Sequence, residues 1–283
     1  MDQGLIMKGI GGFYYIKLAG DEIVECSARG KFRKLDIKPM IGDRVTISRP
    51  YADATTGGAI EEILPRKNSL VRPPVANIDQ IAIVMAAASP VPDLFLIDKL
   101  LVQAHSSDIE TVILINKTDI SQAEEYADIY KKADYDVYLM SAKMMEGLEV
   151  VTSVFKDKIT ALAGNSGVGK SSILNAMGLD VQVGEVSRIK RGKHTTRHTE
   201  LMPLCGGFVI DTPGFSILDI KKSEEQELSD FFPEFGQCSP CKFRGCKHIC
   251  EAGCEVTEAV VRGEIASSRY ESYINILKGE NGR

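Results

Sequence analysis

Residues 164–171 read Gly-Asn-Ser-Gly-Val-Gly-Lys-Ser, and this stretch matches every position of the phosphate-binding pattern G-x-x-x-x-G-K-[S/T]. The residues before it, 159–163, form a short apolar run typical of a buried strand. The residues after it, 172–177, are typical of a helix whose N-terminus faces an anion. The alternative is a glycine-rich turn with a chance lysine, but the strand and the helix argue against it. The stretch therefore predicts a nucleotide-binding loop in an α/β fold.

The residues of this loop suit the binding of a nucleoside triphosphate. Gly164, Gly167 and Gly169 allow positive φ angles, which turn backbone N–H groups toward the β-phosphate. Lys170 would place its charge between the β- and γ-phosphates, and the Ser171 hydroxyl would bind magnesium. We expect the nucleotide to contact the whole loop, namely Gly164, Asn165, Ser166, Gly167, Val168, Gly169, Lys170, Ser171 and Ser172.

Upstream of the loop, apolar runs alternate with amphipathic stretches from residue 78 onward. This alternation indicates a mostly parallel sheet with crossover helices. Strands are predicted at 81–88, 111–115 and 137–140, and helices at 94–104 and 126–132.

A polar motif, N-K-T-D at 116–119, follows the second of these strands. The Asp119 carboxylate can accept hydrogen bonds from N1–H and the N2 amine of guanine, whereas adenine offers neither donor in that arrangement. Asn116 would hold the loop and contact the base edge. The alkyl stem of Lys117 would lie along the base plane.

A second motif, Ser141-Ala142-Lys143, follows the next strand. The Ala142 N–H would donate a hydrogen bond to guanine O6. Alone, N-K-T-D could equally be the N-cap of a helix. Together with S-A-K and the phosphate loop, it predicts a guanine-nucleotide site.

The segment after the phosphate loop completes the predicted site. Residues 184–199 are polar, basic and without periodicity, as expected of a mobile switch loop. Thr195 or Thr196 would complete the magnesium shell, and we prefer Thr196. Asp211, at the end of the last predicted strand, would hold magnesium through water, and the Gly214 N–H would contact the γ-phosphate.

The order of these motifs is unusual, because the guanine-recognition motifs precede the phosphate loop. A circular permutation preserves a folded pocket while it moves the chain termini. The chain then leaves the sheet directly after Asp211. The residues beyond are therefore placed to respond to the nucleotide.

The first 65 or so residues read as short β-rich segments separated by turns, which predicts a small barrel of the oligonucleotide-binding type. Between two strands lies the basic stretch 29–34, R-G-K-F-R-K. Its cations could meet RNA phosphates while Phe32 stacks on a base. A solvated hairpin loop is an equal alternative.

Composition limits the partners. The 283 residues carry a net charge of −5, so any RNA contact must come from local basic patches. No apolar run approaches the roughly 20 residues that span a bilayer, and no secretory signal is visible. We expect no membrane association.

Five of the seven cysteines lie between Cys238 and Cys254, together with His248. Without a secretory signal, this crowding indicates a structural zinc site in a reducing compartment. Five cysteines and one histidine exceed the four ligands that zinc needs, so the residue types leave the choice open. A disulfide-linked or redox module is the alternative.

Four features together resemble the RsgA family, also called YjeQ, of bacterial GTPases of small-ribosomal-subunit assembly. They are the permuted motif order, R-G-K-F-R at 29–33, R-P-P-V-A-N-I-D-Q at 72–80 and C-x₄-C-x-H-x₅-C at 241–254. The resemblance covers essentially the whole chain and implies a multi-domain α/β protein. Its expected parts are an OB-fold RNA-binding domain (1–66), a circularly permuted GTPase domain (72–220) and a zinc-finger-like, α-rich domain (221–283).

The resemblance also implies ligands and partners. The zinc ligands would be Cys241, Cys246, His248 and Cys254, which leaves Cys238 and Cys250 as spare thiols. Lys242, Arg244 and Lys247 would form a basic surface for ribosomal RNA, with simple solvation as the alternative. GTP or GDP, magnesium and one zinc ion are the expected cofactors. The expected partner is the small ribosomal subunit with its rRNA, met in the cytoplasm by a monomeric protein.

Catalysis departs from the better-known small GTPases, which carry a glutamine directly after D-x-x-G to orient the attacking water. Phe215 stands there in this chain and cannot hydrogen-bond water. His194, beside the switch threonines, is our candidate, and the family pattern carries a histidine there. The alternative is an exposed loop histidine.

Two other functions compete with a switch GTPase. One is a non-enzymatic RNA-binding scaffold with GTP as a structural ligand, and only Phe215 favours it. The other is an ATP-dependent kinase or ATPase, which would have no use for N-K-T-D.

Overall fold

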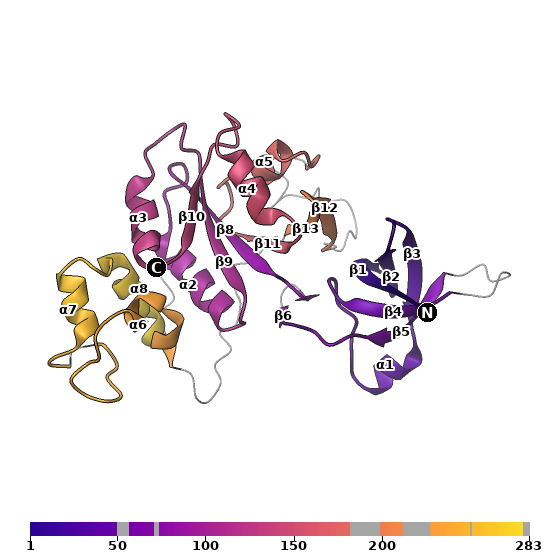
Figure 1. Cartoon of the computed structure of the whole chain (residues 1–283), viewed down its shortest axis with the longest axis horizontal. Helices are drawn as coiled ribbons and strands as arrows, with labels where there is room; N and C mark the ends of the chain where they lie inside the picture. Colours follow the sequence, from indigo (N-terminus) through magenta and orange to yellow (C-terminus); the bar gives the residue numbers. More distant parts are fainter. Residues whose placement is uncertain (50–56, 71–73, 182–198, 212–226, 250, 280–283) are drawn as a thin grey trace.

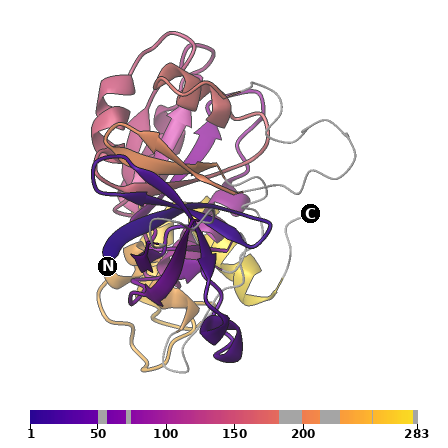
Figure 2. The same cartoon turned by 90° about the vertical axis from the view of Figure 1, so that its right-hand side faces the viewer.

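The computed structural model describes residues 1–49, 57–70, 74–181, 199–211, 227–249 and 251–279. A barrel, a central sheet with helices on both faces, and a helical C-terminal part follow one another along the chain. The central sheet lies between the other two parts (Figure 1). In the view turned by 90°, the barrel lies in front (Figure 2).

The N-terminal strands close into a five-stranded barrel of order β1-β2-β3-β5-β4, as predicted for the oligonucleotide-binding type. The strands are β1 (Asp2–Ile10), β2 (Phe13–Leu18), β3 (Ile23–Ala28), β4 (Arg44–Ser48) and β5 (Gly58–Ile63). The β-rich segments visible in the sequence are 12–18, 22–26, 43–47 and 59–63, so β1 was not predicted. Its two glycines weaken its β-pattern. Gly4 is needed there, because a Cβ atom would lie 2.5 Å from the side chain of Ile16.

The basic stretch of the barrel is a helical turn, α1 (Gly30–Lys34), and Phe32 is buried in the barrel core. The prediction that Phe32 stacks on a base is therefore wrong, and so is the alternative of a hairpin loop. In a single helical turn, one apolar residue among cations points inward while its neighbours point outward. Lys31, Arg33 and Lys34 are accordingly exposed.

The central sheet has the order β10-β9-β8-β11-β13-β12, and all neighbours are parallel except β12 and β13. Its strands are β8 (Gln80–Ala86), β9 (Glu110–Asn116), β10 (Asp136–Leu139), β11 (Ile159–Ala163), β12 (Leu201–Leu204) and β13 (Gly207–Asp211). The predicted strands are confirmed, whereas β12 was not foreseen. Two short strands, β6 (Ser69–Leu70) and β7 (Val75–Ala76), pair between the barrel and this sheet.

Helices cover both faces of the sheet. One core contains residues of α2 (Leu94–His105) and α3 (Glu124–Lys132), and the other contains residues of α4 (Leu148–Phe155) and α5 (Lys170–Ala176). Alternate residues of β8 enter the two cores, which explains its continuous apolar sequence. In the sheet, β8 lies between β9 and β11. The chain first continues from β8 to its neighbours β9 and β10, and it later returns to form β11 on the other side of β8. A crevice at such a switch point is where ligands bind in α/β sheets.

The C-terminal part consists of η1 (Leu228–Phe231), α6 (Pro233–Gly236), α7 (Glu255–Val261) and α8 (Ser267–Leu277). In the sequence, residues 256–277 read as terminal helix, whereas the structure divides this stretch into α7 and α8. The chain breaks after α7, where Gly263 has a φ of +75°. The hydrophobic core of this part includes Val102 of α2, so the C-terminal helices pack directly on the central domain.

A buried cluster of charges joins the same two parts. Arg269 of α8 is 0% exposed and donates to Asp98 of α2 at 2.7 Å. It also donates to both carboxylate oxygens of Glu234 of α6, at 2.7 and 3.1 Å. Burial by itself lowers the pKa of Arg269, but the two carboxylates raise it well above its ordinary value. The guanidinium lies 4.7 Å from the centre of the Phe232 ring, so an aromatic face also meets the charge.

Replacement of Arg269 by alanine should reduce the free energy of unfolding by about 3 to 5 kcal/mol, because two buried carboxylates would lose their cation. The reduction should be full at neutral pH and shrink in acid, since burial raises the folded pKa of Asp98 and loss of the cation would raise it further. Urea unfolding followed by circular dichroism measures both effects. Arg262→Ala, which breaks an exposed pair with Glu264, is the control. Equal losses in the two variants would contradict a structural role for the buried cluster.

Candidate functional site

The phosphate-binding loop lies at the carboxyl end of β11, and its backbone has the predicted conformation. Gly164, Gly167 and Gly169 have φ angles of +131°, +83° and +99°. A Cβ atom at Gly164 would lie 2.1 Å from the carbonyl oxygen of Val84 in β8. At Gly169 it would lie 2.3 Å from the Asn116 side chain. Glycine is required at both positions for close contact as well as for the φ angle.

The two polar residues at the start of α5 are both buried. Lys170 Nζ donates to the carbonyl oxygens of Gly164 and Asn165, at 2.7 and 2.9 Å. The ammonium is thereby held against the loop that we predict surrounds the phosphates. Ser171 is 6% exposed and follows Lys170 in the first turn of the helix.

Asn116 connects the three predicted recognition motifs. Its side-chain amide donates to the carbonyl oxygen of Val168 in the phosphate loop, at 3.0 Å. Its side-chain oxygen accepts from the Ala142 N–H of the S-A-K motif, also at 3.0 Å. Segments that lie far apart in the chain are thus brought together at one edge of the sheet. A guanine O6 at this position would either share the Ala142 N–H with Asn116 Oδ1 or replace Asn116 Oδ1 as its acceptor.

Lys117 has a φ of +67°, and its ammonium bridges two loops. It donates to Gly167 O at 2.8 Å and also to Ser89 O, in the loop between β8 and α2. Ser89 belongs to no sequence motif, and its position directly after the predicted strand 81–88 was the one available signal.

Asp119 is held in place by Ser141. The buried Ser141 hydroxyl donates to Asp119 Oδ1 at 2.7 Å and accepts from the Met144 N–H at 3.1 Å. The Asp119 side chain is exposed, and so is Lys143. Ser141 therefore orients the Asp119 carboxylate, which we predict accepts from guanine, before any base is bound.

Several predicted residues cannot be placed in this site. His194, Thr195, Thr196, Gly214 and Phe215 lie outside the described residues. The backbone of Asp211 ends β13 and pairs in parallel register with Leu162, two residues before the phosphate loop. Asp211 is thus adjacent to the loop in the sheet.

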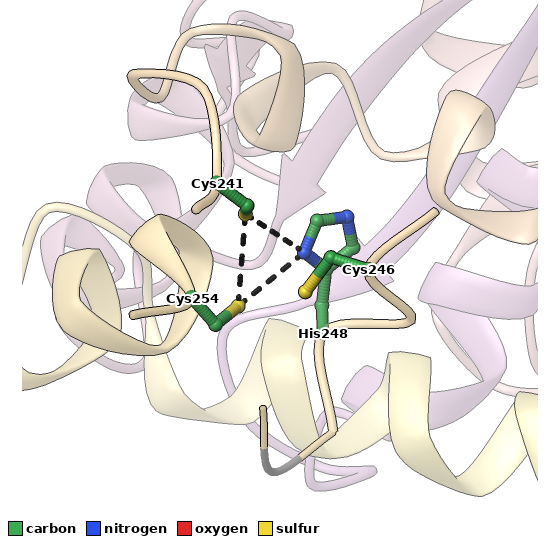
Figure 3. Close-up of side chains that lie close together, drawn as sticks. All are labelled: Cys241, Cys246, His248 and Cys254. Atoms are coloured by element: carbon green, nitrogen blue, oxygen red, sulfur yellow. Dashed lines mark hydrogen bonds between the residues drawn. The ribbon is translucent and has the colours of Figure 1, made fainter. Parts of the chain in front are cut away.

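Four side chains of the C-terminal part converge on one point, namely Cys241, Cys246, His248 and Cys254 (Figure 3). Their ligand atoms all lie within 4.8 Å of one another. His248 Nδ1 lies 3.6 Å from Cys241 Sγ and 3.4 Å from Cys254 Sγ, and the two sulfurs are 3.9 Å apart. Tetrahedral zinc, with bonds of about 2.3 Å to sulfur and 2.0 Å to nitrogen, requires S···S and S···N separations of about 3.8 and 3.6 Å. The cluster fits zinc.

Helix α8 supports this cluster from outside. The Tyr270 hydroxyl donates to His248 O at 2.8 Å and to Ile249 O at 3.1 Å. The Tyr273 hydroxyl donates to Lys247 O at 2.7 Å. Neither tyrosine carried a recognisable sequence signal, because helical tyrosines usually belong to the core.

The thiols differ in their surroundings. Burial raises the pKa of Cys246 to about 12, so metal binding must displace a proton there. Burial also acts to raise the pKa of Cys254, but hydrogen bonds from Thr257 at the start of α7 outweigh it and lower the value. Cys238 donates to Glu234 O and stands outside the cluster, and Cys250 lies outside the described residues.

Three cations predicted to meet RNA lie in the chain between the cluster's ligands. Lys242 and Arg244 are at least partly exposed, and Lys247 pairs with Glu227 at 2.8 Å. The Phe243 side chain beside them is 53% exposed.

In the part of the chain that the structure describes, no helix has the length and apolar character needed to cross a membrane.

Comparison with known proteins gives consistent relatives. A family described as "RsgA GTPase" matches residues 63–221, and "RsgA N-terminal domain" matches residues 3–60. "Small ribosomal subunit biogenesis GTPase RsgA" of Halalkalibacterium halodurans is 44% identical over 98% of this chain and 97% of its own. The Ruminiclostridium cellulolyticum protein of the same name is 46% identical over 98% and 93%.

Two solved structures agree. YjeQ from Thermotoga maritima has a TM-score of 0.83 and 37% identity, covering 100% of this chain and 99% of its own. YloQ, described as a circularly permuted GTPase, has a TM-score of 0.81 and 38% identity, covering 100% and 97%. The family model over residues 63–221 and the full-length relatives agree with both structures, and the chain belongs to the RsgA family of GTPases.

Proposed function

We propose that this protein hydrolyses GTP to GDP and phosphate during maturation of the small ribosomal subunit, with hydrolysis stimulated by the subunit and coupled to release. The observation that carries the proposal is the pair of Asn116 hydrogen bonds, which join a phosphate loop to a guanine-recognition loop at one sheet edge. The name of its relatives, small ribosomal subunit biogenesis GTPase, supports the small subunit as the partner.

Each side of the site has a proposed task. Asp119, oriented by Ser141, accepts from guanine N1–H and N2, and the stem of Lys117 supports the base plane. The phosphate loop donates its N–H groups to the β-phosphate, and Lys170 exchanges its two carbonyl contacts for phosphate oxygens. The base and the phosphates are thus bound by segments that already contact one another.

Magnesium, when bound, neutralises charge on the phosphate oxygens. Ser171, Thr196 and Asp211 are the residues proposed to hold it. In the hydrolysis, water attacks the γ-phosphorus, the bond to the bridging oxygen breaks, and GDP leaves. Phe215 cannot orient this water, so we assign that task to His194, with the Gly214 N–H contacting the γ-phosphate.

We also propose one structural zinc ion, bound by Cys241, Cys246, His248 and Cys254. The separations of 3.4 to 3.9 Å among the ligand atoms of Cys241, His248 and Cys254 support tetrahedral coordination. The exposed cations of α1, together with Lys242 and Arg244, are the proposed contacts to ribosomal RNA. We propose that the protein acts in the cytoplasm as a monomer.

GTP turnover by the zinc-loaded protein, alone and with small ribosomal subunits, tests the function as a whole. Large subunits and ATP serve as controls. Selective acceleration by small subunits is the expected result. GTP binding without acceleration would instead favour the non-enzymatic scaffold, whose one supporting feature is Phe215.

Asp119→Asn should weaken GTP binding about 5- to 150-fold, because removal of one partner costs about 1 to 3 kcal/mol. The same change should improve binding of xanthosine triphosphate, since the new amide can donate to the carbonyl at position 2 of xanthine. Competition against a fluorescent GDP analogue measures both affinities. Asp128→Asn, on the exposed side of α3, is the control. An unchanged preference for GTP over xanthosine triphosphate would refute the role of Asp119.

His194→Ala should lower the subunit-stimulated rate of GTP hydrolysis about 10²- to 10⁴-fold, the usual contribution of a group that positions or activates a reacting water. GTP affinity should remain unchanged. His198→Ala, a histidine of the same segment, is the matched control. A full stimulated rate in His194→Ala would remove His194 from the mechanism.

Cys246→Ser should abolish stoichiometric zinc, whereas Cys238→Ser should retain one zinc ion per chain because Cys238 stands outside the cluster. Metal content measured by plasma mass spectrometry on purified protein decides this. Loss of helical circular dichroism should accompany zinc loss, since metal binding and folding are linked in such small sites. Zinc loss in Cys238→Ser alone would overturn the ligand assignment.

A further inference from the structure

A continuous series of contacts connects the nucleotide-binding loop with the Cys/His cluster. It begins at Lys117, whose ammonium holds the phosphate loop at Gly167 O and the loop before α2 at Ser89 O. At Gly167, a Cβ atom would lie 3.8 Å from Pro90, which places the two loops side by side. Asp93 then caps α2 by accepting from the Leu96 N–H at 3.0 Å.

Helix α2 carries the connection across the domain. Its twelve residues pack on the sheet through Ile97, Leu100 and Leu101, all buried. On the opposite side, Asp98 meets Arg269 of α8 inside the buried charge cluster. A rigid helix thus spans the distance between the loop beside the nucleotide and the C-terminal part.

Helix α8 completes the series at the metal cluster. Arg269 is followed directly by Tyr270, whose hydroxyl holds His248 O and Ile249 O, and Tyr273 lies one turn further on and holds Lys247 O. Residues 247–249 include the proposed ligand His248, and the two tyrosines of α8 hold the backbone of this segment. A shift of α2 relative to α8 would therefore act on Arg269, and through α8 it would move residues 247–249.

We propose that Arg269 is a positioning residue that couples guanine-nucleotide binding to zinc binding through α2 and α8. This inference rests on the proposed nucleotide and zinc sites. The nucleotide restrains Lys117 and the phosphate loop, and therefore also the loop before α2. The zinc ion restrains residues 247–249 and therefore α8. The two restraints meet at one buried guanidinium. Binding of the first ligand therefore already orders part of the chain that the second ligand must order. The second ligand loses less conformational entropy, and binding of the two is cooperative.

Equilibrium competition for zinc with a chromogenic chelator, with and without saturating GDP, measures the coupling in the full chain. We expect GDP to tighten zinc binding at least about 5-fold, the lower end of ordinary coupling between sites. The same factor should separate the GDP affinities of zinc-loaded and zinc-stripped protein, because equilibrium coupling is reciprocal.

Three variants locate the route. Arg269→Lys keeps one charge but cannot bind Asp98 and Glu234 with the same fork, so the GDP effect on zinc affinity should fall toward onefold. Tyr270→Phe should also bring the GDP effect on zinc affinity toward onefold, without disturbing the buried charges. This variant decides the test if Arg269→Lys does not fold. Lys132→Ala is the matched control, because Lys132 joins α3 to Gly263 O at 2.9 Å, outside the proposed route.

The outcomes are distinct. A GDP effect in the natural protein and in Lys132→Ala, but not in Tyr270→Phe, would support the proposal. Binding of both ligands without mutual effect would overturn this inference alone. A GDP effect retained in both Arg269→Lys and Tyr270→Phe, or lost in Lys132→Ala, would overturn the route. Failure of either ligand to bind would overturn the corresponding proposed site and the inference with it.

Discussion

The close contact of the phosphate loop with the ends of β8 and β9 is the constraint on which the nucleotide site depends. Gly164 leaves no room for a Cβ atom against Val84 O, and Gly169 leaves none against Asn116. The Asn116 amide can then reach Val168 and Ala142 at once. A side chain at either glycine would separate the loops, and the residues proposed to bind the base and the phosphates would no longer lie on one rigid edge.

Circular permutation changes what this edge is connected to. In the permuted order, the sheet continues into the C-terminal part after β13, and the barrel precedes β8. These two parts lie on opposite sides of the central domain (Figure 1). The C-terminal part is fastened to α2 by Val102 and by the Arg269 cluster. The C-terminal part therefore contacts the central domain through packed helices and a buried charge cluster.

The strongly periodic elements could be predicted, and the tertiary contacts of individual side chains could not. The central strands and the helices α2 and α3 agree with the apolar patterns, because each pattern reports a buried face. Phe32 shows the limit, since an aromatic residue among cations suits RNA stacking as well as a barrel core. β1 was missed for a similar reason, because closure of the barrel, and not its own sequence, stabilises a glycine-containing strand.

The motifs alone identified the GTPase family, and they predicted a phosphate loop, guanine-recognition loops in permuted order and a surplus of metal ligands. Those conclusions depend on residue types at short spacings, which a sequence displays directly. The tertiary structure decided that Lys117 reaches Ser89, that Tyr270 holds the His248 loop and that Arg269 joins α2 to α6 and α8. These contacts bring together residues 22 to 171 positions apart, and such proximity arises only when loops and helices distant in the chain pack together.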